Sequence, residues 1–308
     1  MGSARPSSPD AGSRVHSHVK ARILINLGGG SVGETLAIER ALEAAGIEGG
    51  VQLIDGGELP AAATKAVGDG AKLIIAGGGD GTISCVAGAV AGTSTALGIL
   101  PLGTLNHLAR DLGIPLDLGE AARLIAAGTS RRIDVAEVNG RVFVNNSAIG
   151  VYPLMVSDRE RQQQRLGRQK PLAMAVAVAR TLLRFSSRRL ILTVNDHKAA
   201  VDTPLLFVGN NRYRLELPGA GTRDRLDSGE LCVIVLRRKS RWGFCAAALR
   251  SLFGRERPID IVQLDGVHTL RVDSSRPSLT ISLDGETETM KPPLDYRIRP
   301  GQLKVIAP

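Results

Sequence analysis

The amino-acid sequence predicts an α/β protein with two parts: a doubly wound parallel sheet in the N-terminal half and mostly antiparallel sheet in the C-terminal half. Three observations support this fold class. Short apolar runs alternate with segments of helical spacing up to Leu112, polar glycine loops follow two of those runs, and strand patterns joined by turn signals dominate from Arg131 onward. A length of 308 residues allows two domains, since domains usually run ~100–200 residues.

The first half reads as alternating strands and helices. Strands are predicted at residues 21–26, 51–54, 72–76 and 96–100. Helices are predicted at residues 34–45, where Gly46 ends the helix, and at residues 61–67. Two further helices are predicted to begin at the ends of the two glycine loops, and they end at about residue 90 and at residue 112. Because such strands connect through right-handed crossovers, the sheet should be parallel and covered on both faces.

The second half reads as a series of strands. Asn139-Gly140 and Asn195-Asp196 each separate two strand patterns and predict tight hairpins. The strands are predicted at residues 133–138, 142–147, 190–194, 199–201, 205–208, 231–236, 269–272, 279–283 and 303–306. Two helices interrupt them, near residues 172–185 and 242–253.

Composition excludes several classes of protein. Hydrophobic residues make up 43% and charged residues 22%, which excludes a mainly disordered chain. Aromatic residues make up only 3%, which argues against a stacking platform for nucleic acid. Three scattered cysteines indicate a reducing compartment, and no run approaches the ~20 apolar residues of a membrane span. We therefore expect a cytoplasmic protein without a transmembrane segment, with residues 1–19 as a disordered tail.

The net charge of +9 is concentrated in two stretches. Residues 159–189 carry nine Lys/Arg and one acid, a balance of +8, and residues 237–257 carry seven and one, a balance of +6. Two interpretations remain open: solvated helix faces, or a surface that binds anionic membranes at the inner face.

The first glycine loop, Gly77-Gly-Gly-Asp-Gly-Thr82, lies between a buried strand and a helix. Glycines let an anion approach the backbone, and the N–H groups and dipole at the helix start attract it. Neither a P-loop nor a dinucleotide fingerprint is present. Asp80 would repel phosphate without a cation, which favours magnesium-assisted nucleotide binding. The alternative is a glycine turn in which Asp80 caps the helix.

The second glycine loop, Pro101-Leu-Gly-Thr-Leu-Asn106, follows the next strand. In a doubly wound sheet, loops at the carboxyl ends of adjacent strands border one crevice, the usual ligand site. Thr104 and Asn106 are therefore candidate ligand contacts, with helix capping as the alternative role.

Two acidic turns in the second half are further candidates. Leu283-Asp-Gly-Glu286 predicts a tight turn in which Asp284 or Glu286 could act as a general base for a hydroxyl. Leu226-Asp-Ser-Gly-Glu230 is a turn by default and a cation site if it faces the crevice.

Five motifs, taken in order, resemble the diacylglycerol kinase catalytic-domain family. They are Gly78-Gly-Asp-Gly-Thr82, Pro101-Leu-Gly-Thr-Leu-Asn106, Ile133-Asp134-Val135, Leu226-Asp-Ser-Gly229 and Leu283-Asp-Gly-Glu286. The sequence is similar to the soluble bacterial lipid kinases, which share this domain with sphingosine kinases. The resemblance implies an ATP-binding α/β domain (20–129 plus 298–308) and an acceptor-binding β-sandwich domain (130–297) like that of NAD kinases. It also implies transfer of the γ-phosphate of ATP, with Mg²⁺, to the hydroxyl of diacylglycerol or a similar lipid.

The resemblance also assigns roles to individual residues, with Asp284 as the catalytic base. It places nucleotide contacts on Asn26, Gly78, Gly79, Asp80, Gly81, Thr82, Ile83, Ser84, Thr104 and Asn106. It places a magnesium-associated turn at Arg225, Ser228 and Glu230, with Asp227 and Asp134 as further candidates. Ser228 stands where the family has a carboxylate, and His107 stands where many members have Asp.

Two other functions remain open at this point. The protein could phosphorylate a soluble hydroxyl acceptor, because related folds include NAD kinases and phosphofructokinases. It could also be a catalytically weak, nucleotide-binding regulatory protein. Ser228 favours this alternative, as does the loop at residues 26–31, which matches the family's Asn-Pro-x-Ser-Gly motif only loosely. The presence of Asp80 and Asp284 opposes it. Nucleic-acid binding is a weak third alternative.

Overall fold

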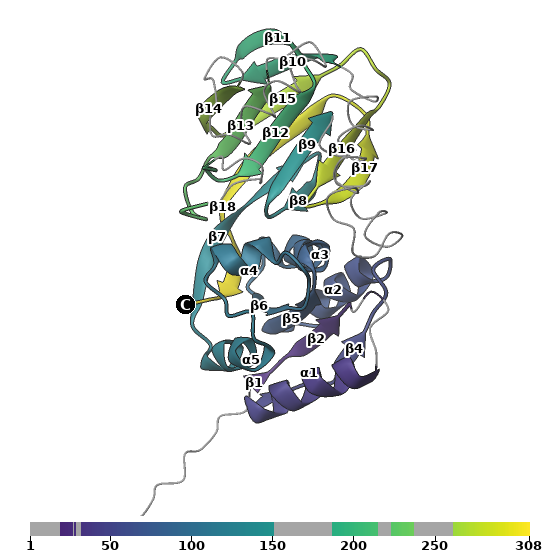
Figure 1. Cartoon of the computed structure of the whole chain (residues 1–308), viewed down its shortest axis with the longest axis vertical. Coiled ribbons are helices and arrows are strands. Elements are labelled where there is room, and N and C mark those ends of the chain that lie inside the picture. The colour runs from purple at the N-terminus through teal and green to yellow at the C-terminus, as the bar shows by residue number, and fades with distance from the viewer. Residues whose placement is uncertain (1–18, 27, 29–31, 151–186, 215–222, 237–260) are drawn as a thin grey trace, which may run out of the picture.

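The computed structural model describes residues 19–26, 28, 32–150, 187–214, 223–236 and 261–308. In Figure 1 the α/β half lies below and the β half above, and β7 and β18 run from one half into the other. No helix among the described residues is long and apolar enough to cross a membrane. The predicted helices at 172–185 and 242–253, most of both basic stretches and residues 1–18 lie outside the described residues.

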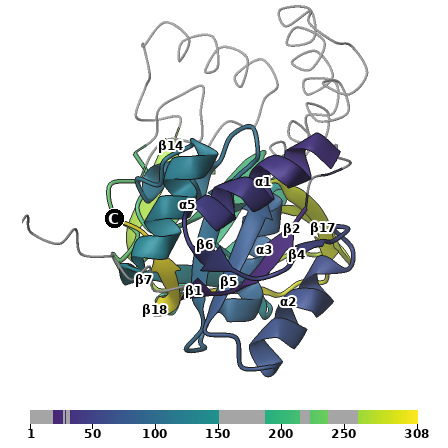
Figure 2. The ribbon, with the colours of Figure 1, turned by 90° about the horizontal axis from the view of Figure 1, so that it is seen from below.

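The α/β half is built on parallel strands in the order β6-β5-β2-β4. The strands are β2 (Arg22–Ile25), β4 (Val51–Leu53), β5 (Leu73–Gly78) and β6 (Ala96–Pro101), and the short pair β1 (Val19–Lys20) and β3 (Ile47–Glu48) lies apart. Figure 2 shows α1 (Val32–Ala44) and α5 (Leu118–Ala127) side by side over one face of the sheet. On the other side, α2 (Leu59–Gly68) packs against α3 (Asp80–Val90), and α4 (His107–Asp111) follows β6.

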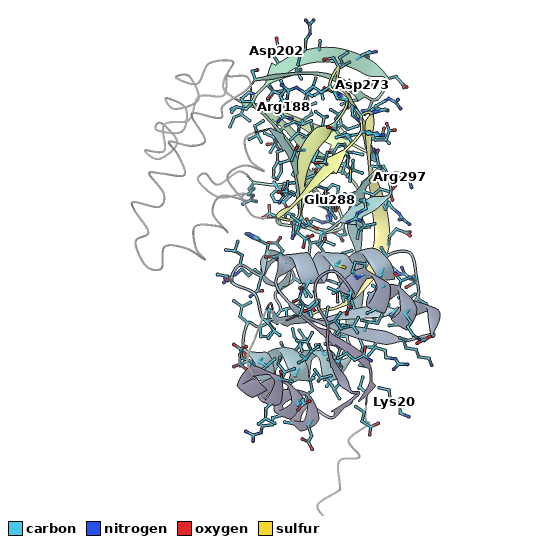
Figure 3. All side chains as sticks on the ribbon, turned by 90° about the vertical axis from the view of Figure 1, so that its right-hand side faces the viewer. Lys20, Arg188, Asp202, Asp273, Glu288 and Arg297 are labelled. Carbon is cyan, nitrogen blue, oxygen red and sulfur yellow. The ribbon has the colours of Figure 1, made fainter. Side chains whose placement is uncertain are left out.

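The β half is a sandwich of two sheets. One sheet has the order β14-β13-β12-β9-β16-β17, and all its pairings are antiparallel. Its strands are β9 (Asn146–Gly150), β12 (Leu205–Asn210), β13 (Leu231–Leu236), β14 (Ile261–Val267), β16 (Leu279–Leu283) and β17 (Glu286–Met290). The facing strands are β7 (Ser130–Val138), β8 (Arg141–Phe143), β10 (Arg188–Val194), β11 (His197–Thr203), β15 (Thr269–Asp273) and β18 (Leu294–Ile306). Figure 3 shows Arg188, Asp202 and Asp273 towards one end of this half and Lys20 at the opposite end of the molecule.

Strand β18 joins the two halves into one connected sheet. Its first residues pair with β15, its length pairs with β7, and Val305 pairs with Leu97 of the parallel sheet. Its side chains follow the same division, since Leu294 and Tyr296 are buried in the β core whereas Leu303 is buried in the α/β core. The end of this strand therefore lies in the α/β half, and the strand is much longer than the predicted 303–306.

Most of the predicted elements are present within a few residues. The turns at Asn139-Gly140 and Asn195-Asp196 have positive φ at both residues, as the predicted hairpins require. The predicted strand at 142–147 is wrong as a single element, because the chain leaves the ladder between β8 and β9. Helix α5 was not predicted, although Asp117 accepts a hydrogen bond from Glu120 N–H and Gly128 closes the helix in the left-handed region.

We expect the joining strand β18 to be sensitive to loss of core volume. Leu303 is fully buried, so Leu303→Ala should lower the free energy of unfolding by about 2–5 kcal/mol. Leu53 on β4 is 57% exposed, so Leu53→Ala should change the free energy of unfolding by less than about 0.5 kcal/mol. Urea denaturation measures both, and equal effects would contradict the role of β18 in the core.

Candidate functional site

The two glycine loops lie side by side at the carboxyl ends of β5 and β6. Gly78 pairs with Pro101 in the sheet, and the N–H of Leu102 donates to the carbonyl of Gly78 at 3.2 Å. A Cβ added to Gly103 would lie 2.4 Å from the Cα of Gly79, so the loops touch through their backbones. The predicted juxtaposition of the loops is therefore present, and glycine is needed where they meet.

The first loop leads directly into α3. Gly79 is the N-cap residue, and no side chain caps the helix there, so the N–H groups of its first turn remain available to an anion. Asp80 is partly exposed, and its side chain forms no hydrogen bond or ion pair with another described residue. A Cβ on Gly78 would lie 2.5 Å from Oγ1 of Thr82, a buried residue that supports the loop from within, as does the buried Ile83. The loop has the backbone approach and the donors that a phosphate group requires.

The other predicted nucleotide contacts differ in their freedom to bind. Thr104 is exposed at the second loop. The Asn106 side chain is buried and bonds its own loop, donating to Gly103 O at 2.7 Å and accepting from Gly103 N at 3.0 Å. Asn26 accepts a hydrogen bond from Gly28 N–H at 3.0 Å, and most of the loop after it lies outside the described residues. Asn106 therefore shapes the second loop rather than presenting free polar atoms.

Asp284 occupies the tight turn between β16 and β17, with positive φ at both Asp284 and Gly285. Its side chain does not face open solvent, because the residue is only 8% exposed. Oδ1 accepts from the N–H groups of Asn145 at 2.7 Å and Asn146 at 2.9 Å, and Oδ2 accepts from Val144 N–H at 2.7 Å. Val144 and Asn145 link β8 to β9, and Asn146 is the first residue of β9, so the carboxylate explains why the predicted strand is broken there.

A fourth donor connects this carboxylate to the glycine loop. The Ser84 hydroxyl on α3 donates to Oδ2 of Asp284. On the same helix, a Cβ added to Gly81 would lie 2.5 Å from Oε1 of Glu286, so the second acidic residue of the turn rests against the first helical turn. The structure thus brings both candidate carboxylates to α3 and to the first glycine loop.

Burial raises the pKa of Asp284 above the ordinary aspartate value. Desolvation is the largest influence, and the hydrogen bonds from Ser84 and the three amides oppose it by stabilising the charged form. A carboxyl group with a raised pKa holds a proton more readily than a surface aspartate, which suits a group that must accept one.

The residues of the predicted magnesium turn are paired with protein groups. Arg225 and Asp227 form an exposed ion pair at 3.0 Å, which lowers the pKa of Asp227. Ser228 donates its hydroxyl and its N–H to Oδ1 of Asn211 at 2.7 and 2.8 Å. Glu230 accepts from Gly266 N–H at 2.8 Å and pairs with Arg212 at 3.3 Å.

Asp134, the remaining metal candidate, is also fully engaged. It is 2% exposed, and its two oxygens accept from Gly229 N–H and Gly301 N–H, each at 2.8 Å. Among the described residues no group of three His, Cys, Asp or Glu side chains could hold a metal ion. This donor set does not fit a bound Mg²⁺, because its carboxylate oxygens are committed to amides and arginines.

A buried arginine near Asp284, Arg223, was not among the site residues that the sequence predicted. The Arg223 side chain is 0% exposed and pairs with Asp111 at 2.7 Å, which links the β half to α4. It also donates to the carbonyl of Val144 at 2.6 Å and to Oδ1 of Asn145 at 2.7 Å. The only available signal was a short charged run, Arg223-Asp-Arg225, next to the predicted metal turn.

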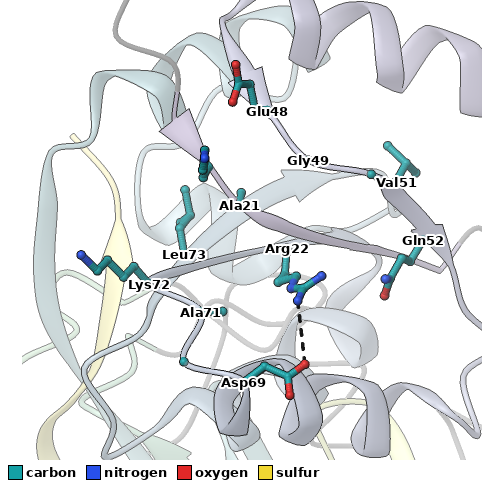
Figure 4. Close-up of a pocket in the computed structure, with 13 residues that line it drawn as sticks. Ala21, Arg22, Glu48, Gly49, Val51, Gln52, Asp69, Ala71, Lys72 and Leu73 are labelled. Atoms are coloured by element: carbon teal, nitrogen blue, oxygen red, sulfur yellow. Dashed lines mark ion pairs between the residues drawn. The ribbon is translucent and has the colours of Figure 1, made fainter.

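A hollow of about 620 Å³ lies at the opposite edge of the parallel sheet, where β2, β4 and β5 begin. Figure 4 shows Arg22 and Asp69 facing each other across it, at 3.8 Å. Ligands of doubly wound sheets bind at the carboxyl ends of strands. The glycine loops and Asp284 therefore define the candidate site, and this hollow does not.

Two family models match the chain along most of its length. Residues 20–138 match the diacylglycerol kinase catalytic domain, and residues 155–307 match the YegS C-terminal NAD kinase beta sandwich-like domain. The chain belongs to the diacylglycerol kinase catalytic-domain family.

Individual relatives agree with this assignment. The probable lipid kinase YegS-like of Pseudomonas syringae pv. syringae (strain B728a) is 32% identical over 265 residues, 82% of each chain. A protein with the same name from Pseudomonas aeruginosa PAO1 is 31% identical over 303 residues, covering 94% of this chain and 95% of that one. The crystal structure of a putative diacylglycerol kinase from Bacillus anthracis str. Sterne has a TM-score of 0.72 at 22% identity, covering 94% and 97%, and supports the fold.

The raised pKa of Asp284 predicts a pH dependence of stability. The folded state favours the protonated carboxyl, so its contribution is complete below the ordinary value of 3.8 and is lost as the pH rises through the folded pKa. We expect the free energy of unfolding of the parent, relative to Asp284→Asn, to fall over that interval. The Asn amide would face N–H donors, which lowers the free energy of unfolding of the variant. Because Asn does not titrate, this loss is the same at every pH. Urea denaturation in steps of pH measures the difference, and a difference that rises with pH would contradict this prediction.

Proposed function

We propose that the protein is an ATP-dependent lipid kinase that transfers a phosphoryl group to the hydroxyl of diacylglycerol or a similar lipid. The observation that carries the proposal is the Ser84–Asp284 hydrogen bond, because it joins the glycine-loop helix to a buried carboxylate of the β half. The names of the two Pseudomonas relatives support a lipid acceptor, since both are described as probable lipid kinases.

The glycine loop is suited to hold the triphosphate of Mg·ATP. The N–H groups of the first turn of α3 would bind phosphate oxygens, and the contact of Gly79 with Gly103 keeps side chains out of their way. Asp80 would face the cation that accompanies the nucleotide, since a free carboxylate beside phosphates needs one. The nucleotide would supply the γ-phosphoryl group, and the Mg²⁺ bound with it would neutralise phosphate charge.

Asp284 is the proposed general base. The acceptor oxygen would form its bond to the γ-phosphorus, the bond from that phosphorus to the bridging oxygen of ADP would break, and the acceptor proton would pass to Asp284. Ser84 and the three amides fix the orientation of this carboxylate before the acceptor arrives. A base with a raised pKa must lose its own proton first, so kcat should fall as the pH drops through that pKa.

The outer face of the six-stranded sheet supports an apolar acceptor. Phe207, Tyr213, Cys232 and Ile234 form a buried cluster that is separate from the core between the sheets. In register with it lie two buried side chains, Asn146 and Ser282, whose oxygens have no hydrogen-bond partner within the described part of the chain. Asn146 also gives its N–H to Asp284, so unpaired polar atoms and apolar side chains meet next to the proposed base. An acyl glycerol combines a hydroxyl with long apolar chains, which matches such a surface.

The same proposal assigns one substrate to each half of the protein and places the protein at a membrane surface. The α/β half, with the end of β18, would bind the nucleotide, and the β half would bind the acceptor. A lipid acceptor places the reaction at an anionic membrane surface, where the two basic stretches would dock the cytoplasmic protein; most of their residues lie outside the described part of the chain.

Phosphoryl transfer to an acceptor panel tests the proposed function. Radiolabelled ATP is incubated with vesicles that contain diacylglycerol, sphingoid bases or phosphatidylglycerol, and with soluble alcohols. We expect label in a lipid product with the parent and none with Asp80→Ala, which should remain folded because its side chain bonds no described residue. Label only in soluble alcohols, or ATP binding without turnover, would favour one of the alternative functions instead.

We expect Asp284→Asn to lower kcat by about 10²–10⁴-fold, the usual contribution of a positioned base, and to leave the KM for Mg·ATP nearly unchanged. Asp295→Asn is the matched control, because it removes only an exposed ion pair with Arg271. Glu286→Gln tests the competing carboxylate, which lies against Gly81. If Glu286→Gln abolishes turnover while Asp284→Asn retains it, the base is Glu286.

A further inference from the structure

We propose that Arg223 is a positioning residue for the reaction, because it holds from behind the three amides that orient Asp284. This inference rests on the proposed function, since it assigns Arg223 a role in the activity of Asp284. Neither the family motifs nor the relatives' names assign this arginine a role.

The geometry places Arg223 and Asp284 on opposite sides of one short segment. The segment is the link Val144-Asn145-Asn146, whose N–H groups all donate to the Asp284 carboxylate. Arg223 donates to the carbonyl of Val144 at 2.6 Å and to the side-chain oxygen of Asn145 at 2.7 Å. The link therefore cannot rotate without breaking hydrogen bonds on one side or the other.

Two further contacts fix the arginine itself. Its guanidinium carbon lies 5.3 Å from the centre of the Tyr213 ring, and the Tyr213 hydroxyl donates to the carbonyl of Asn145 at 3.0 Å. Asp111 at the end of α4 accepts from its Nε at 2.7 Å. Because α4 follows the second glycine loop, the same guanidinium connects the nucleotide side of the site to the base.

The chemistry of the side chain explains why arginine is needed. Guanidinium presents donors in a rigid planar fork, and here the fork serves Asp111, Val144 and Asn145 at once. Lysine keeps the charge but has one nitrogen, which cannot reach all three acceptors. Arg223→Lys therefore keeps the buried positive charge opposite Asp111 and releases part of the link.

The expected effect is on turnover rather than on nucleotide binding. Arg223→Lys should lower kcat by about 10²-fold, the size of effect that a small misplacement of a reacting group produces. The KM for Mg·ATP should stay within about twofold, since the hydrogen bonds that Arg223 forms with described residues go to residues 111, 144, 145 and 210 and not to a glycine loop. Arg214→Lys is the matched control, because Arg214 forms an exposed ion pair with Asp224 at 2.7 Å, and it should behave as the parent.

A double mutant separates positioning from a general loss of structure. If Arg223 acts through Asp284, the variant carrying both Arg223→Lys and Asp284→Asn should have the kcat of Asp284→Asn alone, because effects of residues that act as a unit do not add. Additive losses in the double mutant, or a parental kcat in Arg223→Lys, would overturn the proposal. If Arg223→Lys does not fold, Asp111→Asn replaces it in the comparison of single and double mutants. We then expect Asp111→Asn to lower kcat by about tenfold, and a parental kcat would overturn the proposal.

Amide hydrogen exchange distinguishes failure of this inference from failure of the proposed function. In Arg223→Lys the amides of residues 144–146 should exchange at least about tenfold faster than in the parent, while the amide of Leu97 in β6 should not change. Unchanged exchange at 144–146 overturns the positioning role whatever the enzyme does. Faster exchange in a protein whose parent phosphorylates no acceptor would support the link to Asp284 and reject the proposed kinase activity.

Discussion

The site depends on one buried carboxylate that is surrounded by donors. Asp284 accepts hydrogen bonds from three consecutive amides and from Ser84, and these donors come from both halves of the molecule. A buried carboxylate without partners would cost several kcal/mol, so the surrounding chain must supply donors or the group must stay protonated. The break between β8 and β9 supplies them, because a strand that remained in its ladder could not turn three N–H groups towards one side chain.

Helix α3 connects this carboxylate with the glycine loop. Its first turn is the proposed anion-binding end, and Ser84 lies four residues after Asp80, about 6 Å further along the axis at 1.5 Å per residue. A rigid helix can therefore set the distance between the two parts of the site, which loops alone would leave variable.

Two buried polar groups between the halves, Asp134 and Arg223, are paired within the protein. Asp134 fastens the turn at Gly229 and the bulge at Gly301 of β18, and Arg223 fastens α4 to the link before β9. The turn that carries a metal in the family pattern is held here by Asn211, Asp134 and surface ion pairs. Ser228 in place of a carboxylate agrees with this arrangement, since a hydroxyl can donate to Asn211 whereas a carboxylate cannot.

The sequence by itself determined the features that depend on neighbouring residues. The order of strands and helices, the glycine loops and the hairpins at Asn139-Gly140 and Asn195-Asp196 follow from local periodicity and from backbone conformations that few residues tolerate. The proximity of the two loops was also predictable, because adjacent parallel strands end at the same edge. The order of the motifs likewise indicated the family, and the resemblance predicted Asp284 as the catalytic base.

Only the tertiary structure decided how those residues are used. The length of β18, the commitment of the Asp134 oxygens and the burial of Arg223 depend on segments far apart in the chain, 167 residues in the case of Asp134 and Gly301. The ladder break at 144–145 has the same origin, since its cause is a side chain 140 residues later. Hydrogen-bond donors find their acceptors through space, and a sequence pattern records only the periodicity of its own segment. Residues whose role is to orient another residue are therefore visible only once the chain has folded.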